Sequence, residues 1–290
     1  MGNAPTEARF LLNDLARELA SAAIDSPRRD ANLILQMALL SDEPILMHHE
    51  VSLSPAAQER LTDLMQRRKQ GCPISRLRGS REFYSLEFAL NEATLDPRPD
   101  SEVMVEAAIA HYQTKSHHKA GSLHIGDFGT GSGCLLLSVL ANAPHASGIG
   151  LDISGDAVRQ ATANAATHSL SHRAEFIISD WDDALDRDVQ FDMILTNPPY
   201  IPTGDEPNLA PEVRLFDPAL ALFAGASGLD AYRCVMRIVA RRLAQGGVCF
   251  VEIGQGQEDD VTALGIAAGL VPDGQLKDLA GIIRVLKFLK

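Results

Sequence analysis

The segment Asn197-Pro198-Pro199-Tyr200 has the residue types needed to hold a flat amide or amino group in one orientation. Two prolines fix φ and supply no N–H, so the carbonyls of Asn197 and Pro198 are not committed to a continuing strand. The Asn197 side-chain oxygen and the Pro198 carbonyl could each accept one hydrogen of a planar –NH2 group, with Tyr200 packed on its face. Such fixed acceptors would orient the nitrogen lone pair and favour positive charge on nitrogen.

The same four residues could be only a strand terminator followed by a proline-rich turn, which is the better interpretation when such a segment stands alone. Here it follows the apolar run "FDMIL" and does not stand alone. Other strand-length runs in this part of the chain also end in glycine, acidic or aromatic residues.

A glycine-rich loop follows one of these runs, in "HIGDFGTGSGCLLLSVL". Gly129, Thr130, Gly131, Ser132 and Gly133 lie where a strand is expected to turn into a helix. Glycines there permit positive φ and let the backbone approach a ligand. The spacing is not the G-x-G-x-x-G of dinucleotide binders, and no Gly-Lys-Ser/Thr follows, which excludes a P-loop.

An acid and an aromatic residue follow the next two runs. Asp152 in "GLDIS" stands 25 residues after Asp127, near the offset at which a carboxylate meets ribose hydroxyls in nucleotide-binding folds. It could instead cap the helix that begins near Gly155, although Ser154 can also do so. Trp181 in "SDWDD" could cover an adenine face, or it could be a core residue.

The elements that must position these residues alternate between strand and helix. The runs "SLHIGDFG", "ASGIGLDI", "AEFIISD", "FDMILTNP" and "GGVCFVEIG", mostly separated by helical stretches, predict a mostly parallel, doubly wound α/β sheet. Two further apolar runs, broken by Ala280-Gly281, predict a terminal antiparallel hairpin. The glycine loop, Asp152, Trp181 and Asn197 should then lie at one edge of the sheet.

The N-terminal part predicts a small helical domain. Ser26-Pro27 and Ser54-Pro55 are helix-start signals, and Gly71 is a helix end. The stretch around Gly79-Ser80 has the pattern of a β-hairpin. We therefore expect a helical substrate-recognition domain at 1–73, a β-hairpin linker at 74–95 and the α/β domain at 96–290.

Composition narrows the classes of function. The net charge of −12 disfavours nucleic acid as a partner, and the four cysteines, without a C-x-x-C pair, fit neither a disulfide framework nor a zinc site. We expect no bound metal. No apolar stretch approaches the roughly 18 residues that span a bilayer, so we predict a cytoplasmic protein with no membrane association. A monomer is expected, because no heptad suggests self-association.

The motifs together resemble a known family. "DFGTGSG", "LDIS", "SDW" and "NPPYI", in this order, are similar to those of class I S-adenosylmethionine-dependent methyltransferases acting on planar nitrogen. "REFYSLEFALNEATLDPRPDSE", "LFDPALALFAGASGLDAYR" and "VEIGQGQ" resemble the HemK/PrmC family of glutamine N5-methyltransferases. The resemblance covers almost the whole chain. It implies a Rossmann-like, seven-stranded sheet and methylation of the Gly-Gly-Gln glutamine of peptide chain release factors in translation termination.

The resemblance also implies roles for single residues. S-adenosylmethionine, whose product is S-adenosylhomocysteine, would bind at the glycine loop and Asp152, with Trp181 by the adenine. The substrate glutamine would be bound by Asn197, Pro198, Pro199 and Tyr200. Of these, Asn197, Pro198 and Tyr200 would be catalytic, and Asn197 would also contact the cofactor. No covalent enzyme intermediate is expected, because no nucleophile–base pair accompanies the motif.

Some residues depart from the family pattern or have no assigned role. Phe128 stands where Leu is usual, Asp96 where an aliphatic residue is common, and Asp217 where Glu is usual. The first two could alter the pocket shape. Arg98 and Glu102 in "PRPDSE" lie in a family segment that borders the active site, although a helix N-terminus explains most of that stretch.

Three other functions remain open at this point. A sister enzyme of the family methylates a glutamine of ribosomal protein uL3, and the motifs barely separate the two substrates. An NPPY segment also serves adenine-N6 methyltransferases, although no basic DNA-reading module is evident. A non-catalytic cofactor sensor would not need the Asn197 clamp.

Overall fold

The computed structural model describes residues 6–116 and 122–290, and the chain divides into two compact units. One unit contains the residues up to Gly79 together with Ala210–Phe216, and the other contains Ser80–Leu209 and Asp217–Lys290. None of the helices in the described ranges combines the length and the hydropathy that crossing a lipid bilayer requires.

The first unit is helical, as expected, and its helices pack their apolar sides into one core. Ser54 caps α3, since its Oγ accepts a hydrogen bond from Ala57 N at 3.2 Å. The elements are α1 (Ala8–Ser21), α2 (Pro27–Leu39), α3 (Pro55–Lys69), α4 (Ile74–Arg78), α8 (Pro211–Phe216) and the two-residue strands β1 (Thr6–Glu7) and β2 (Glu50–Val51).

The segment containing α8 belongs to the helical unit although it is remote in sequence. Arg68 on α3 is buried and pairs with Asp30 at 2.7 Å and with Glu212 of α8 at 2.6 Å. A buried guanidinium needs such partners, because an uncompensated charge in the core is strongly destabilising. The sequence pattern did not indicate this return of the chain.

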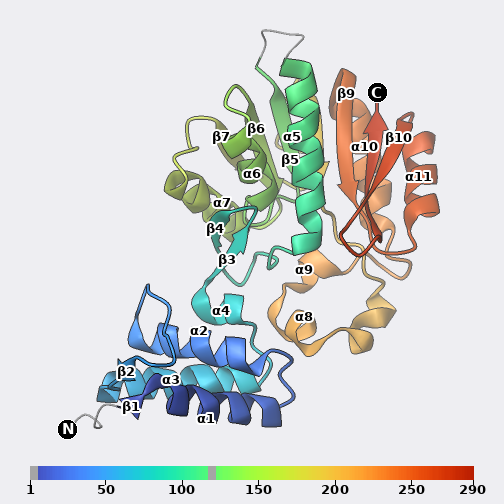
Figure 1. Cartoon of the computed structure of the whole chain (residues 1–290). Coiled ribbons are helices and arrows are strands. Elements are labelled where there is room, and N and C mark those ends of the chain that lie inside the picture. The colour runs from blue at the N-terminus through green and yellow to red at the C-terminus, as the bar shows by residue number, and fades with distance from the viewer. Residues whose placement is uncertain (1–5, 117–121) are drawn as a thin grey trace. The chain divides into compact units, whose positions relative to one another are not determined.

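The second unit contains a seven-stranded sheet in the order β10-β11-β9-β8-β5-β6-β7. Five neighbouring strands are parallel, whereas β11 runs antiparallel to β9 and β10 antiparallel to β11 (Figure 1). The predicted α/β class, the mostly parallel sheet and the terminal hairpin are confirmed. The strands are β5 (His124–Phe128), β6 (Ser147–Asp152), β7 (Ala174–Ile178), β8 (Phe191–Thr196), β9 (Leu243–Glu252), β10 (Val271–Lys277) and β11 (Ile283–Leu289).

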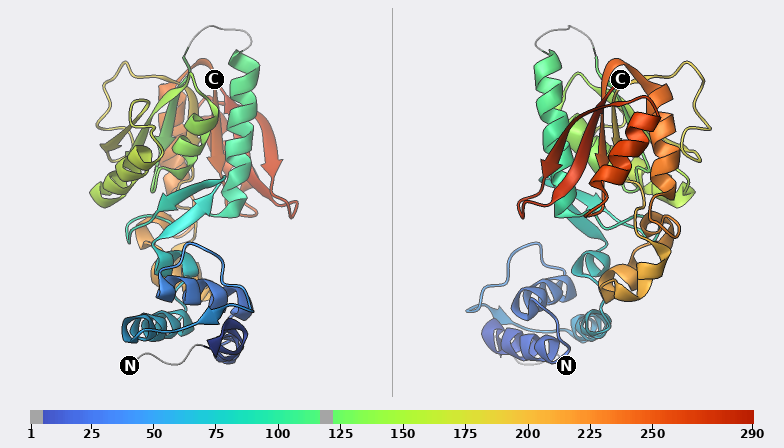
Figure 2. Two further views of the ribbon diagram at one scale, coloured as in Figure 1. Left: turned by 60° about the vertical axis from the view of Figure 1, so that its left-hand side comes forward. Right: turned by 90° about the vertical axis from the view of Figure 1, so that its right-hand side faces the viewer.

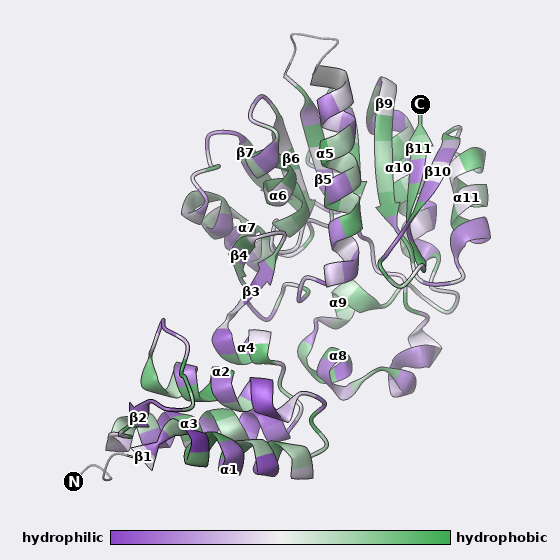
Figure 3. Ribbon diagram, viewed as in Figure 1, coloured by the Kyte–Doolittle hydropathy of each residue, from purple (hydrophilic) through white to green (hydrophobic). Residues whose placement is uncertain are grey.

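Helices cover both faces of this sheet. The face with α5 is visible in Figures 1 and 2, and Figure 3 shows hydrophilic and hydrophobic residues mixed along that helix. Along β9, Phe250 packs into the core on the α5 side, and Cys249 and Val251 pack into the core on the α10 side. The covering helices are α5 (Glu102–Ser116), α6 (Cys134–Asn142), α7 (Gly155–Thr167), α10 (Asp230–Arg242) and α11 (Glu258–Ala267).

The segment predicted as a β-hairpin linker begins instead with a helix. α4 occupies Ile74–Arg78 and ends at Gly79, which has a left-handed φ of 75°. The hairpin then follows as β3 (Ser80–Phe83) and β4 (Leu86–Ala89), with positive φ at Tyr84 and Ser85 in the turn. The aromatic alternation therefore located the hairpin, whereas "ISRLR" is too short for its helical period to be recognised.

The carboxyl ends of the parallel strands lie along one edge of the sheet. Phe128 at the end of β5 pairs with Leu151 of β6 and with Thr196 of β8, and Thr196 pairs with Val251 of β9. The chain adds β6 and β7 on one side of β5, and then crosses to the other side of β5 to form β8 and β9. In open α/β sheets such a switch point forms the ligand crevice. Short helices near this edge are η1 (Pro99–Ser101), η2 (Thr203–Asn208) and α9 (Ala219–Leu222).

Candidate active site

A pocket lies at the switch point, between the loop after β5 and the segment after β8. Of the predicted site residues, it brings together Gly129, Thr130, Gly131, Ser132, Asp152, Asn197 and Pro199. The remaining lining residues, most of which the sequence motifs did not single out, are Ala93, Leu95, Pro97, Arg98, Ser101, Cys134, Leu135, Ile153, Ser154, Leu220 and Ala221.

The glycines of the loop have two different physical roles. All three have positive φ, at 76° for Gly129, 55° for Gly131 and 80° for Gly133. A Cβ on Gly129 or Gly131 would meet no atom within 4 Å, so these two positions leave room for a ligand. A Cβ on Gly133 would lie 3.2 Å from core atoms such as those of Leu137, and Gly133 does not line the pocket. Gly133 therefore serves helix packing.

Asp152 presents its carboxylate to the pocket from the end of β6. Its Oδ2 accepts a hydrogen bond from Gly131 N and its Oδ1 one from Ser154 N, both at 2.9 Å. Ser154 Oγ accepts a hydrogen bond from Ala157 N at 3.3 Å, so Ser154 caps α7. Asp152 is thus not needed as the cap, and its fixed carboxylate is available to accept hydrogen bonds from a polar ligand.

Asp127 lies beneath the glycine loop rather than in the pocket. It is fully buried and accepts a hydrogen bond from Thr130 Oγ1 at 2.6 Å. Burial raises its pKa to about 7, although the hydrogen bond from Thr130 acts to lower the pKa. This carboxyl group fixes the loop conformation from below.

The NPPY segment contributes acceptors that the fold leaves uncommitted. Asn197 and Pro199 line the pocket, and Pro198 is buried. Within the described part of the chain, no group donates a hydrogen bond to the carbonyl of Asn197 or Pro198. Tyr200 does not line the pocket, and its carbonyl accepts a hydrogen bond from Gln257 Nε2 at 3.1 Å. The backbone carbonyls of Asn197 and Pro198 are therefore free to accept hydrogen bonds, and their role in binding a substrate amide stays a prediction.

Trp181 lies outside the lining of the pocket. It has a positive φ of 52° and packs partly buried against the core on the α10 side. Its role beside an adenine stays a prediction. Ile153, which directly follows Asp152, lines the pocket and is half exposed, and Ile178 at the end of β7 is also exposed. The signal available in the sequence for this surface was an apolar residue directly after a strand-end acid.

The roles of Arg98, Glu102 and Asp217 were open in the sequence, and the structure shows ion-pair or hydrogen-bond partners for each. Arg98 forms an ion pair with the buried Asp217, whose Oδ1 also accepts a hydrogen bond from Asp96 N at 3.3 Å. Glu102 Oε1 accepts a hydrogen bond from Tyr84 N at 3.1 Å and so anchors the β3–β4 turn. Asp217 therefore holds the "PRP" backbone that lines the pocket.

Phe128 and Asp96, the two departures that could alter the pocket shape, are not part of the pocket lining. Phe128 is fully buried and packs edge-on against Phe191, with ring centroids 5.9 Å apart. Asp96 is buried as well, and neither Phe128 nor Asp96 lines the pocket. Both substitutions affect layers beneath the site.

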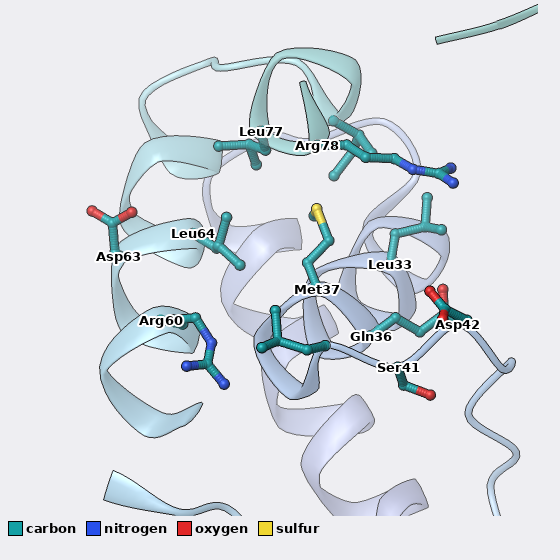
Figure 4. Close-up of a pocket in the computed structure, with 12 residues that line it drawn as sticks. Leu33, Gln36, Met37, Ser41, Asp42, Arg60, Asp63, Leu64, Leu77 and Arg78 are labelled. Atoms are coloured by element: carbon teal, nitrogen blue, oxygen red, sulfur yellow. The ribbon is translucent and has the colours of Figure 1, made fainter. Parts of the chain in front are cut away.

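A second hollow, of about 740 Å³, lies wholly within the helical unit. Figure 4 shows Met37, Leu64 and Leu77 facing one another, with Arg60 and Asp63 at the side. Arg60 Nε donates to the carbonyl of Ala38 at 2.9 Å. This hollow contains neither a glycine loop nor a strand-end acid, so the chemistry inferred above belongs to the edge of the sheet.

We predict that Asp127→Asn changes how stability depends on pH. Because the pKa of Asp127 is about 7 in the folded state and about 4 in the unfolded state, only the folded state holds its proton between these values. The free energy of unfolding should fall as pH rises from about 4 to about 7, and less steeply in the variant. Urea unfolding at several pH values measures this difference, and equal slopes would contradict the assignment.

Comparison with known proteins identifies the family of this chain. The family models described as "PrmC N-terminal domain" and "Methyltransferase small domain" match residues 6–79 and 110–221. The release factor glutamine methyltransferase of Rhodospirillum rubrum is 42% identical over 98% of this chain and 88% of its own length. The enzyme of the same name from Bradyrhizobium diazoefficiens is 42% identical over 95% of this chain and 92% of its own.

Among solved structures, the ribosomal protein L11 methylase of Lactobacillus delbrueckii subsp. bulgaricus matches with a TM-score of 0.48 at 16% identity, over 68% of this chain and 81% of that one. The two family-model matches and the near-full-length identity to curated enzymes place the chain in one family. It belongs to the release factor glutamine methyltransferases, with a PrmC-type N-terminal domain ahead of the methyltransferase domain.

Proposed function

We propose that this protein transfers the methyl group of S-adenosylmethionine to the side-chain N5 of the glutamine in the Gly-Gly-Gln motif of peptide chain release factors. The observation that carries the proposal is the adjacency of two features at the switch point. The glycine loop with Asp152 lies beside Asn197, and the carbonyl of Pro198 is uncommitted. The names of the relatives that match nearly the full length support this substrate.

The pocket residues fit S-adenosylmethionine. Gly129 and Gly131 leave the space that a methionine chain passing close to the backbone needs. Asp152 can accept hydrogen bonds from ribose hydroxyls, and the exposed side chain of Ile153 offers an apolar surface to a base. S-adenosylmethionine would supply a methyl group on a positively charged sulfur, which is already an activated donor.

The protein's contribution to the reaction is orientation. An amide nitrogen is a poor nucleophile because its lone pair is delocalised into the carbonyl. Asn197 Oδ1 and the Pro198 carbonyl each accept one N–H of the glutamine amide, which turns the lone pair toward the donor and favours the positive charge that develops on nitrogen. The extra proton on nitrogen passes to water after transfer.

The setting of the reaction follows from the same proposal. The net charge of −12 suits a protein substrate better than a nucleic acid. We place the enzyme in the cytoplasm as a monomer that binds its release factor partly through the helical unit.

The substrate proposal is tested with radiolabelled S-adenosylmethionine and three separate acceptors: a bacterial release factor, ribosomal protein uL3 and double-stranded DNA. We expect label on the release factor, lost when the glutamine of its Gly-Gly-Gln motif is replaced by Ala. Label on uL3 alone would identify uL3 as the substrate in place of the release factor. Label on DNA alone would overturn the proposal of glutamine methylation.

We predict that Asn197→Ala slows methyl transfer by about 10²–10³-fold, because one of the two acceptors is lost. The Kd for S-adenosylmethionine should change by less than about threefold, since Asp152 and the glycine loop are intact. Single-turnover methylation and isothermal titration calorimetry give the two quantities. The exposed Asn208 on η2 offers a matched control, and Asn208→Ala should leave both unchanged.

We predict that Asp152→Ala affects cofactor binding more than the rate of methyl transfer. Loss of a charge-assisted acceptor should weaken S-adenosylmethionine binding by about 10–100-fold. Methyl transfer at saturating cofactor should fall far less. Asp156→Ala, in the first turn of α7 and exposed, is the control. A normal Kd in Asp152→Ala would remove Asp152 from the cofactor site.

A further inference from the structure

Glu252 is a buried carboxylate that lies next to Asn197. It is the last residue of β9 and is only 3% exposed. Because Thr196 of β8 pairs with Val251 of β9 in parallel register, the next residues along the two strands are Asn197 and Glu252. The sheet itself therefore places this acid beside the residue proposed to bind the substrate amide.

The neighbours of the Glu252 carboxyl group connect it to the pocket. The side chains of Ser101, at the end of η1, and of Asn197 are hydrogen-bonding neighbours that act to lower its pKa. Oε2 of this carboxylate is buried and has no well-aligned donor within the described part of the chain. Ser101 and Asn197 both line the pocket, so Glu252 lies directly behind its wall.

The chemistry of the pair determines which way the Asn197 amide faces. An ionised carboxylate only accepts hydrogen bonds, whereas an Asn side chain has one accepting and one donating end. Glu252 must therefore take the NH2 end of Asn197, which leaves Oδ1 directed to the pocket. With a protonated Glu252, the acid could donate to Oδ1 instead, and the amide could present its NH2 to the substrate.

The backbone around this pair is also held. Tyr232 Oη donates to the carbonyl of Glu252 at 3.0 Å. Gln257 Oε1 accepts from Gly254 N at 3.0 Å, and its Nε2 donates to the carbonyl of Tyr200 at 3.1 Å. The NPPY segment is thus tied to the end of β9 at both Asn197 and Tyr200.

We propose that Glu252 is a positioning residue for methyl transfer, which fixes the Asn197 amide with its oxygen toward the substrate nitrogen. This inference rests on the proposed function, because it assigns to Asn197 the acceptor role given above. Glu252 itself does not touch the substrate.

The state of this carboxyl group depends on its surroundings. Burial raises the pKa of Glu252 to about 7, while the hydrogen bond from Ser101 and the charge of Arg284 act to lower it. The ionised form needed to orient Asn197 therefore builds up as pH rises through about 7. The titratable and charged groups that face Glu252 are Asp100 on η1, Cys134 on α6, Tyr200 after β8, Tyr232 on α10 and Arg284 on β11.

We predict that Glu252→Gln lowers kcat by at least about tenfold and changes the KM for both substrates by less than about threefold. The glutamine side chain matches Glu252 in size, but its amide can pair with Asn197 in either orientation. In the wild type, kcat should rise with pH through about 7, and this rise should be absent in the variant. Glu258→Gln, a partly exposed position in the first turn of α11, is the control.

A double-mutant cycle separates orientation from a general loss of structure. If Glu252 acts through Asn197, Glu252→Gln should add no more than about twofold to the defect of Asn197→Ala. An equal fold loss in the wild-type and Asn197→Ala backgrounds would overturn the proposal, as would an unchanged kcat and pH profile in Glu252→Gln.

A measurement without substrate keeps this test independent of the release-factor assignment. In protein labelled with 15N at asparagine, the side-chain NH2 signals of Asn197, identified by their loss in Asn197→Ala, should shift as pH passes through about 7. They should not shift in Glu252→Gln. A wild-type signal that is constant with pH would refute the inference even if release factors are methylated. A shifting signal with no release-factor methylation would refute only the proposed function.

Discussion

The parallel pairing of β5 with β8 is the contact on which the rest of the site depends. It places Phe128 opposite Thr196, and Thr196 Oγ1 donates to the carbonyl of Phe128 at 2.8 Å. The residues that follow the paired ends of the two strands are Gly129 and Asn197, so the proposed cofactor loop and the proposed substrate clamp are neighbours although 68 residues separate them in sequence. A one-residue slip in this register would turn the Asn197 side chain to the wrong face of the sheet.

Rigidity after β8 comes from prolines and from hydrogen bonds made elsewhere. Two prolines restrict φ over Pro198-Pro199, and Ile201 then pairs with the end of α9, where Ile201 N donates to Leu222 O at 2.9 Å. Within the described part of the chain, the carbonyls of Asn197 and Pro198 have no hydrogen-bond donor. Acceptors that are held in place but not satisfied lose little freedom when a substrate amide arrives, which is the condition for preorganised electrostatic stabilisation.

Local signals in the sequence predicted the elements well and their long-range partners poorly. Ser54, the strand-end positions of Asp152 and Asn197, and the terminal hairpin follow from short-range capping, periodicity and turn chemistry. The return of residues 210–216 to the helical unit does not, because it depends on Glu212 meeting a buried Arg68 more than 140 residues away. Glu252 escaped notice for the same reason: "VEIG" reads as a strand end, and only the β8–β9 register reveals its neighbour. Trp181 is partly buried against the core on the α10 side, and its place beside an adenine stays a prediction.

Buried or partly buried carboxylates recur around the pocket, and their polar contacts hold parts of its wall. Asp127 accepts a hydrogen bond from the Thr130 hydroxyl, and Asp152 accepts hydrogen bonds from two backbone N–H groups. Asp217 pairs with Arg98 and accepts a hydrogen bond from Asp96 N, and Glu252 has Ser101 and Asn197 as neighbours that act to lower its pKa. Burying acids is costly, and the raised pKa values of Asp127 and Glu252 record that cost. A methyl transfer from a positively charged sulfur gives this arrangement a second consequence. Negative charge on these carboxylates favours a cationic cofactor and a nitrogen that becomes positive, while in the proposed clamp the substrate amide contacts only neutral oxygens.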